Sequence, residues 1–585
     1  MAELSIATAA PCSASVLLTR ARAFALAIGI ITLTLIMLWL SASRTGLLVC
    51  DTDCGETLLA INAANSFAQH GVEFGLLENL HSHAWPVLYI HNVNIGSLTF
   101  TLLEALGLHA IEQKMLLPFA VYGLGLFYVF LTARQFSKSD LAAIVILVNF
   151  AIVYWAVGSF ASNALRSWHT LAYFAVVFHA ASLTRSRWHV AGLFFGALIA
   201  FGCGYDFWLI CGASAGFLLL FNSNDRCRSI VIAGVAFAVP FIARQVHVAA
   251  VIGPAIWWQD FIYSVAIKVP YAHRLIPIPP LADIDAWYER NRIFRPPAQP
   301  GNPWWMILFT FCHMIEFVTL PRWGFLTLFT YAGALAAALL QPLVPSFIGR
   351  FSLLLLLPLT LGAVTGLALL APFSLHVYFK HEFPLIAFPL LLAKGITIAA
   401  CLQWLKQRWT WRMAAGLIIS LYVADVALTH RNNTRYGLYP NLGWIPFAAT
   451  TNPAEITLAA QRLSGHAEPM IGLKQSLYTY ISPHDVAKAA TRYIVYQPIE
   501  RIHDFDSVVP TCQHTDWISR MLGWHGKTPE EYSCIYKFPL TPQARRMPSL
   551  DEAIRLLPGY KVTDRSDFGI GYVILQRDAD PDTRD

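Results

Sequence analysis

The chain has 585 residues, of which 56% are hydrophobic and only 13% are charged, and its formal net charge is +6. This composition excludes an ordinary soluble globule and is typical of a polytopic α-helical membrane protein, so the lipid bilayer is its first predicted partner. Lysine and arginine occur singly or in pairs rather than in a patch, so we predict no nucleic-acid partner.

The first apolar run, Ala23 to Leu40, follows Arg20 and Arg22 and is long enough to cross a bilayer. It lacks a convincing small-residue cleavage site, which favours a membrane anchor over a removed signal peptide. The preceding arginines predict a cytoplasmic N-terminus, which puts residues 41–112 on the outer face of the membrane.

Hydropathy predicts about eleven membrane spans, each near the length that a bilayer requires. They lie near residues 23–40, 113–133, 140–157, 167–184, 189–204, 206–221, 228–249, 322–341, 351–373, 383–404 and 411–429. Two further apolar runs, Val87 to Leu106 and Trp304 to Leu320, are not expected to cross. The first carries His91, Asn92 and Glu104, which are costly at a bilayer centre, so we predict a helix in the outer interface.

This assignment satisfies the positive-inside rule. It puts on the cytoplasmic side the basic residues Arg134, Lys138, Arg185, Arg187, Arg226, Arg228, Arg350, Lys406 and Arg408. The predicted organisation is therefore a membrane domain, 1–429, with outer loops 41–112 and 250–320, followed by an outer soluble domain, 430–585. We expect the protein in the plasma (inner) membrane.

The C-terminal region differs sharply in composition from the membrane domain. Helical stretches at Pro453–Leu463 and Leu550–Leu557 are mixed with short strands at Tyr493–Gln497 and Gly571–Gln576, a pattern typical of a small α/β domain. In an oxidising compartment Cys512 and Cys534 could form a disulfide, and the sequence leaves this pairing open, as it does for Cys50 and Cys54.

Three carboxylates, Asp51, Asp53 and Glu56, follow the first span within six residues. One interpretation is that they cap the next helix and complement its dipole, which would suffice for Glu56. Two like charges beside a low-dielectric surface repel each other, an arrangement usually tolerated where protons are moved. We therefore expect Asp51 or Asp53 to have a catalytic role.

The order of features along the membrane part, roughly residues 20–430, resembles the GT-C glycosyltransferases. The closest likeness is to the dolichyl-phosphate-mannose protein mannosyltransferases and their bacterial relatives that use polyprenyl-phosphate sugars, including the aminoarabinose transferases. The resemblance rests on Asp51, Asp53 and Glu56, then Gly71, the element Tyr89-Ile90-His91, Gly107, and the late element His376-Val-Tyr378-Phe-Lys380-His381 followed by Pro389.

The resemblance implies an inverting transfer of a sugar from a polyprenyl-phosphate donor to a hydroxyl of an envelope glycan, lipid or protein on the outer face. Asp51 or Asp53 would be the catalytic base, and no cofactor is expected. The implied substrate contacts are Glu56, Tyr89, His91, Arg166, Asp206, His376, Tyr378, Lys380 and His381. Arg166, Lys380 and His381 would hold the phosphate, with His376 behind them; the alternatives are snorkelling or interfacial polar residues.

Two features outside the motifs also suggest a site. Asp206 lies between two short apolar runs, where it would bind acceptor or sugar hydroxyls or stand in water at a helix turn. His81, His83 and His91 offer metal donors, but their spacing fixes no coordination geometry, and substrate contacts explain them more simply. We predict no metal. A secondary transporter and a non-catalytic envelope assembly or binding protein are the alternative functions.

Overall fold

A computed structural model of the chain describes the membrane part more completely than the C-terminal region. The described residues are 20–45, 75–76, 87–88, 90, 95, 98–99, 102–103, 106–108, 111–151, 164–183, 186–268, 277, 279–291, 293, 325–340, 347–370, 383–435, 470–473, 493–496, 551, 554–555, 559–566 and 572–577. Most of them are helical, as predicted.

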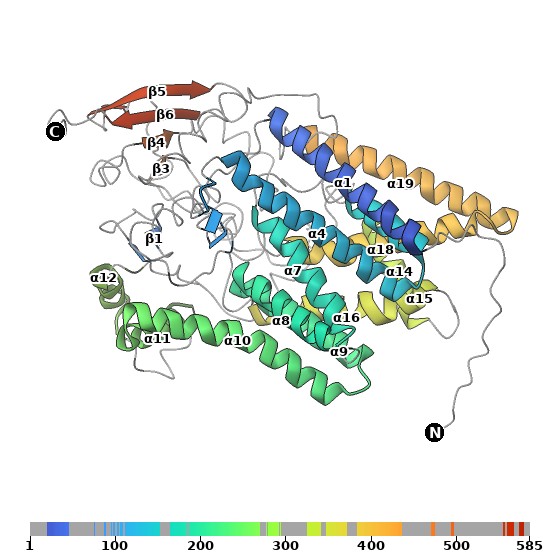
Figure 1. Cartoon of the computed structure of the whole chain (residues 1–585), viewed down its shortest axis with the longest axis horizontal. Coiled ribbons are helices and arrows are strands. Elements are labelled where there is room, and N and C mark those ends of the chain that lie inside the picture. The colour runs from blue at the N-terminus through green and yellow to red at the C-terminus, as the bar shows by residue number, and fades with distance from the viewer. Residues whose placement is uncertain are drawn as a thin grey trace, which may run out of the picture.

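Long apolar helices run side by side in a bundle (Figure 1). They are α1 (Arg20–Thr45), α4 (Ile111–Ser137), α5 (Asp140–Asn149), α7 (Ala164–Ala180), α8 (Arg187–Gly202), α9 (Tyr205–Asn222), α10 (Arg226–Ile252), α14 (Phe325–Leu339), α15 (Phe347–Phe351), the π-helical turn η4 (Ser352–Leu356), α16 (Leu357–Leu370), α18 (Phe383–Trp404) and α19 (Trp409–Arg435). Every predicted span overlaps one of these helices, with α15, η4 and α16 forming one continuous rod.

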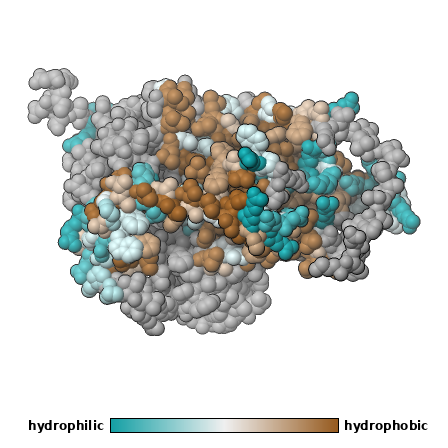
Figure 2. Space-filling view, turned by 60° about the horizontal axis from the view of Figure 1, so that its bottom comes forward, coloured by the Kyte–Doolittle hydropathy of each residue, from teal (hydrophilic) through white to brown (hydrophobic). Residues whose placement is uncertain are grey.

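Among the described residues, four helical segments are long and apolar enough to cross a membrane. These are Leu116–Ser137, Tyr205–Asn222, Arg226–Ile252 and Phe347–Leu369. In the space-filling view, a broad apolar surface separates hydrophilic residues gathered toward the two sides (Figure 2). This is the architecture of an integral membrane protein.

The two ends of the bundle differ in charge. At one end, which we call the basic end, helices meet at short turns that carry Arg134, Arg228 and Arg408, and Arg134 is paired with Asp140. The opposite end, where α10 bends at Gly253 into further helices, we call the α11 end; the strands described below also lie toward it (Figure 1). The basic residues that hydropathy places in one compartment are thus gathered at one end.

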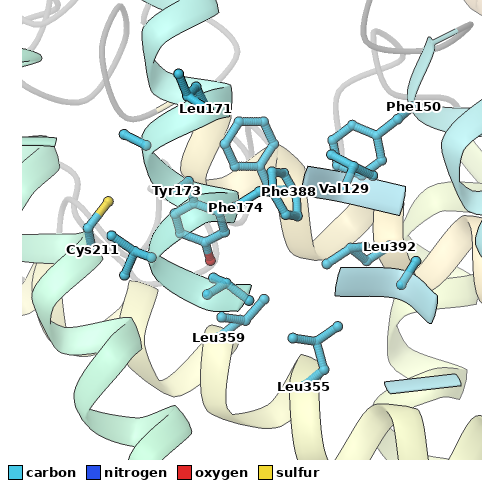
Figure 3. Packing of buried hydrophobic residues seen from close by; sticks show 14 of the residues in the cluster. Val129, Phe150, Leu171, Tyr173, Phe174, Cys211, Leu355, Leu359, Phe388 and Leu392 are labelled. Carbon is cyan, nitrogen blue, oxygen red and sulfur yellow. The ribbon is translucent and has the colours of Figure 1, made fainter. Parts of the chain in front are cut away.

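Aromatic side chains fill the centre of the bundle. Tyr173 and Phe174 of α7 pack against Phe388 of α18, with ring centroids 5.1 and 5.0 Å away, and Phe174 also meets Phe150 edge-on at 5.3 Å (Figure 3). Leu359 of α16 belongs to the same buried cluster. Helices that are far apart in sequence therefore share one core, which positions both ends of the bundle.

Glycines let two of these helices come unusually close. Gly362 and Gly366 of α16, one turn apart, face Ser214 and Ile210 of α9. A Cβ atom at Gly366 would lie 2.9 Å from the Ile210 Cα, and one at Gly362 would overlap the backbone of Ser214. Small residues spaced by four are a common way for membrane helices to achieve close backbone contact.

Replacing Gly362 by valine should force α9 and α16 apart and destabilise the protein by about 1–3 kcal/mol. Gly216→Val on α9 is the matched control, because no atom lies within 4 Å of the Cβ position there. The two variants would be compared by thermal unfolding in detergent. Equal unfolding midpoints for both would show that the close approach of the two helices is not needed.

The predicted outer loop 250–320 contains two helices that the sequence interpretation treated as loop. They are α11 (Pro254–Lys268) and α12 (Leu281–Asn291), which pack on each other through Tyr263, Ile284 and Tyr288. The proline-rich composition hid these helices, because the prolines lie at the first position of α11, between the two helices and after α12. Trp304 to Leu320 lies outside the described residues.

The helix predicted from Val87 to Leu106 is wrong at its start and confirmed in its later part, and its position in the membrane interface stays a prediction. Val87 and Leu88 form strand β2 (Val87–Leu88), paired antiparallel with β1 (Gly75–Leu76). Ile95 is the first residue of this run that the structure describes as helical. The helix closes at Gly107, whose φ is +78°, and the Leu108 N–H donates to the Leu103 carbonyl at 2.9 Å, a glycine C-cap.

Near the C-terminus a four-stranded sheet is described. Its strands are β3 (Met470–Leu473), β4 (Tyr493–Tyr496), β5 (Tyr560–Ser566) and β6 (Tyr572–Arg577), in the order β3-β4-β6-β5, with only β3 and β4 parallel. The two predicted strands, β4 and β6, are confirmed, and residues 551, 554 and 555 of the predicted helix Leu550–Leu557 are helical. Pro453–Leu463, Cys512, Cys534, Cys50 and Cys54 lie outside the described residues.

Candidate functional site

Most of the predicted site residues lie outside the described part of the chain. These are Asp51, Asp53, Glu56, Tyr89, His91, His376, Tyr378, Lys380 and His381, together with His81 and His83. Of the remaining two, Arg166 belongs to the first turn of α7 and Asp206 to the first turn of α9. Both helices begin at the α11 end, because α8 between them runs in the opposite direction.

Asp206 is half-buried rather than fully in water. It follows Gly204, whose φ of +128° lets the chain turn from α8 into α9 without a spacer. A carboxylate in this first turn complements the helix dipole. The neighbouring Phe207 is fully buried against the ring of His169, at a centroid distance of 4.3 Å, which anchors the turn. The predicted position at a helix turn is confirmed, whereas full hydration is not.

A chain of hydrogen bonds connects three helices beside Asp206. The amide of Gln245 on α10 donates to the Tyr205 hydroxyl at 3.3 Å. The indole N–H of Trp257 on α11 donates to the Gln245 side-chain oxygen at 2.9 Å. Together with Arg244, His247 and Asp260, these residues form what we call the α11-end cluster.

Arg244 gives this cluster a buried positive charge. Its side chain is only 7% exposed, and its Nη1 lies 3.3 Å from His247 Nδ1 on the next helical turn. The charges of Arg244 and Asp260 both act on the Tyr205 hydroxyl. Because a guanidinium stays ionised even when buried, and because it presents several N–H donors in a plane, this is a suitable group for holding a phosphate or carboxylate.

Asp260 connects the cluster to α12. Its carboxylate accepts a hydrogen bond from the Tyr288 hydroxyl at 3.0 Å, and that hydroxyl also lies 3.2 Å from the Ser264 hydroxyl. All three side chains are at least half-buried. The polar groups of α11 therefore point inward, toward α10 and α12, and hold these helices over the end of the bundle.

The first predicted outer loop packs onto the same region. Ile90 is buried with Val248 of α10 and with Tyr263 and Ile284 of α11 and α12. Farther along the chain, Ile95 packs on Gly202 at the hairpin between α8 and α9. A Cβ atom added at Gly202 would lie 3.0 Å from the Ile95 Cβ atom. Ile90, the middle residue of the Tyr-x-His element, thus packs where α10, α11 and α12 meet.

The sequence interpretation did not single out Arg244, Gln245 or His247. A signal was present, because Ala-Arg-Gln-Val-His interrupts the last turns of the apolar run 228–249. Polar residues near the end of a span usually reach toward the membrane surface, so the pattern alone did not indicate a buried cation. One helical turn farther on, Val248 packs against α11 and α12, which the sequence interpretation treated as loop.

A second polar group, also not anticipated, lies inside the bundle. Lys394 Nζ of α18 lies 2.7 Å from Asp425 Oδ2 of α19, and both side chains are almost completely buried. Asp425 also accepts from the Leu326 N–H at the start of α14. The sequence signal was a charge deep within each of two apolar runs, Lys394 in 383–404 and Asp425 in 411–429, which marks a site of functional or structural importance.

The chain contains one match to the G-x-S-x-G motif of serine hydrolases, and its structural context shows what the residues do. Gly212-Ala-Ser214-Ala-Gly216 has the spacing of a nucleophile elbow, which requires a sharp turn between a strand and a helix. Ser214 instead lies within α9, fully buried against Gly362 of α16. It therefore serves helix packing and is not an exposed nucleophile.

The described α11-end cluster has donors of the kind that bind anions, together with the carboxylate of Asp260. It combines a buried guanidinium with an imidazole, a phenol and an amide, whose donors suit phosphate oxygens and sugar hydroxyls. In the part of the chain that the structure describes, no group of three or more potential metal-ligating residues comes together.

No known family model matches the chain, and no curated protein is significantly similar to it in sequence.

Proposed function

We propose that the protein is a glycosyltransferase of the membrane that moves a sugar from a polyprenyl-phosphate donor to an acceptor hydroxyl, with inversion at the anomeric carbon. The observation that carries the proposal is the buried Arg244, placed with Tyr205 and Gln245 at an end of the bundle onto which the first outer loop packs through Ile90 and Ile95. A lipid-linked phosphate requires such a cation beside an apolar surface.

The proposed topology has eleven spans, a cytoplasmic basic end and an extracytoplasmic α11 end in the plasma membrane. The positive-inside rule supports this orientation, since Arg134, Arg228 and Arg408 gather at one end. The C-terminal sheet then lies outside the cell, where it would shape the acceptor site. The acceptor is a glycan, lipid or protein of the envelope.

The proposed base is Asp51 or Asp53. Asp51 follows the end of α1, at Thr45, by six residues, a stretch that spans at most about 20 Å. The base would take the proton of the acceptor hydroxyl while its oxygen bonds to the anomeric carbon. The bond from that carbon to the phosphate oxygen breaks at the same time, and polyprenyl phosphate leaves with the electron pair.

Arg244 would stabilise the charge that grows on the departing phosphate. Arg166, His376, Lys380 and His381 remain the further cationic candidates. Asp206, Glu56, Tyr89, His91 and Tyr378 would contact the sugar or the acceptor. An inverting displacement requires the acidic base and the cationic phosphate site to lie on opposite sides of the anomeric carbon.

Arg244→Gln should slow transfer roughly 10- to 150-fold, the equivalent of losing one charged hydrogen bond of about 1.5–3 kcal/mol. Arg244→Lys should recover part of the rate because the charge returns. Arg290→Gln on α12 is the matched control, since the Arg290 side chain is exposed and its Nε–H donates to the Ala286 carbonyl of the preceding helical turn. Transfer by purified variants would be measured; a wild-type rate for Arg244→Gln would remove Arg244 from the phosphate site.

The function is tested most broadly by mass spectrometry of envelope glycans, lipids and glycoproteins from cells with and without the protein. We expect one hexose or pentose mass to disappear from one class of acceptor and to return when the gene is restored. If the two kinds of cell gave identical profiles under conditions in which wild-type cells produce the protein, the proposal would be contradicted.

A secondary transporter is the second candidate, and the buried Lys394–Asp425 pair is the observation that favours it. Substrate uptake into vesicles that persists in an Asp51→Asn/Asp53→Asn variant and is lost in Asp425→Asn would support it. The bonds of Asp425 to both Lys394 and the start of α14 favour a structural role for the pair instead.

A further inference from the structure

Helix α11 is amphipathic with its polar side turned inward. Asp260 and Ser264 face α12 and bond to the Tyr288 hydroxyl. The opposite side carries the large apolar residues Trp258 and Phe261, which are 53% and 47% exposed. A helix surrounded by water would show the reverse arrangement, because its apolar side would be the buried one.

The exposed apolar side of α11 continues that of α10. Along α10 the exposed residues Val235, Val239, Ile242 and Val246 form a stripe at helical spacing, part of the surface that faces lipid in a membrane span. At Gly253, with φ +91°, the chain bends and the apolar surface passes onto α11. Figure 2, turned to bring the lower side of Figure 1 forward, shows this apolar surface as a band across the middle of the molecule.

The aromatic residues of α11 form an ordered group. Trp258 stacks on Phe261 with ring centroids 5.7 Å apart and planes at 20°, and Trp257 lies 6.0 Å from Trp258. Trp257 points its N–H to Gln245 within the α11-end cluster. Tryptophan is enriched where the headgroups of a bilayer meet its hydrocarbon, because its ring is apolar and its N–H is polar.

We propose that α11 lies on the membrane, with the Trp258–Phe261 face in the headgroup region of the lipid leaflet at the α11 end. The occupant of this face is the bilayer itself, because the face continues the lipid-facing stripe of α10 through the exposed residues Ala250 and Pro254. Amphipathic helices with Trp and Phe on one side bind bilayers in this way. As a consequence, Arg244 and Tyr205, beneath the inner side of α11, lie at the depth of lipid phosphates.

The test uses the full-length protein in vesicles of phosphatidylethanolamine and phosphatidylglycerol. The photoreactive residue p-benzoylphenylalanine replaces Trp258 or Phe261 in separate variants, and covalent lipid adducts are counted by intact-protein mass spectrometry after illumination. Val246, the last exposed residue of the α10 stripe, is the lipid-facing reference. Ala286, exposed on the polar side of α12, is the reference for water.

We expect lipid adducts at 258 and 261 in yields close to that at 246 and at least about fivefold above that at 286, since interfacial side chains remain in contact with lipid. Because both positions are exposed, the replacements leave the packed side of α11 unchanged. Yields at 258 and 261 no higher than at 286 would overturn the inference. The experiment measures lipid contact only, so its outcome is independent of glycosyl transfer.

Discussion

Replacing Lys394 by methionine is expected to destabilise the protein by about 3–5 kcal/mol, because Asp425 would be left charged and buried without its partner. The two side chains are 1% and 0% exposed, and the ammonium nitrogen lies 2.7 Å from the carboxylate. Asp425 also holds the start of α14 through the Leu326 N–H. The free energy of unfolding would be measured by denaturant titration in mixed micelles.

Two further variants separate a lost ion pair from a lost side chain. The double variant Lys394→Met/Asp425→Asn should recover most of the stability, because no unpaired charge remains. The side-chain oxygen of the new asparagine can still accept from the Leu326 N–H. Arg134→Met breaks the half-exposed pair with Asp140 and should cost less than about 1 kcal/mol. If Lys394→Met unfolds like wild type, the buried pair contributes nothing to stability.

An Asp51→Asn/Asp53→Asn variant is expected to lower glycosyl transfer at least about 100-fold, because a positioned base contributes a factor of this size or more. The amides keep the size and most hydrogen bonds of the side chains but cannot take a proton. Single substitutions then identify the base, since only one should reproduce the full loss. The measurement is the restoration of the missing glycan mass in cells that lack the wild-type protein.

Asp225→Asn is the matched control for this experiment. Asp225 caps α10 at the basic end, where its carboxylate accepts from the Arg228 N–H at 3.3 Å. An amide oxygen can cap a helix almost as well, so glycan transfer should stay at the wild-type level. Full restoration by the doubly substituted Asp51/Asp53 protein would exclude an aspartate base at these positions.

The helices of the bundle could be predicted from the sequence because hydropathy reports whole apolar segments one at a time, which needs no tertiary information. Gly107 could likewise be recognised, since a helix end with positive φ is a local property that favours glycine. Strands β4 and β6 were recognised from their β-branched and aromatic residues.

The features that were missed depend on which segments meet in space. Arg244 is buried by the way the helices pack at the α11 end, and Lys394 pairs with Asp425 on the neighbouring helix. The apolar run that begins at Val87 starts as strand β2 because it pairs with β1, which ends eleven residues earlier in the chain. Sequence periodicity reports one segment at a time and cannot report such pairings.

The most direct measurement of the central claim is sugar transfer by the purified protein in proteoliposomes. A panel of radiolabelled polyprenyl-phosphate sugars would be offered together with envelope fractions from cells that lack the protein. We predict that one donor transfers its label to an envelope acceptor and releases polyprenyl phosphate, and that Asp51→Asn/Asp53→Asn abolishes both. Turnover of no donor by folded protein, or equal turnover by the double variant, would contradict it.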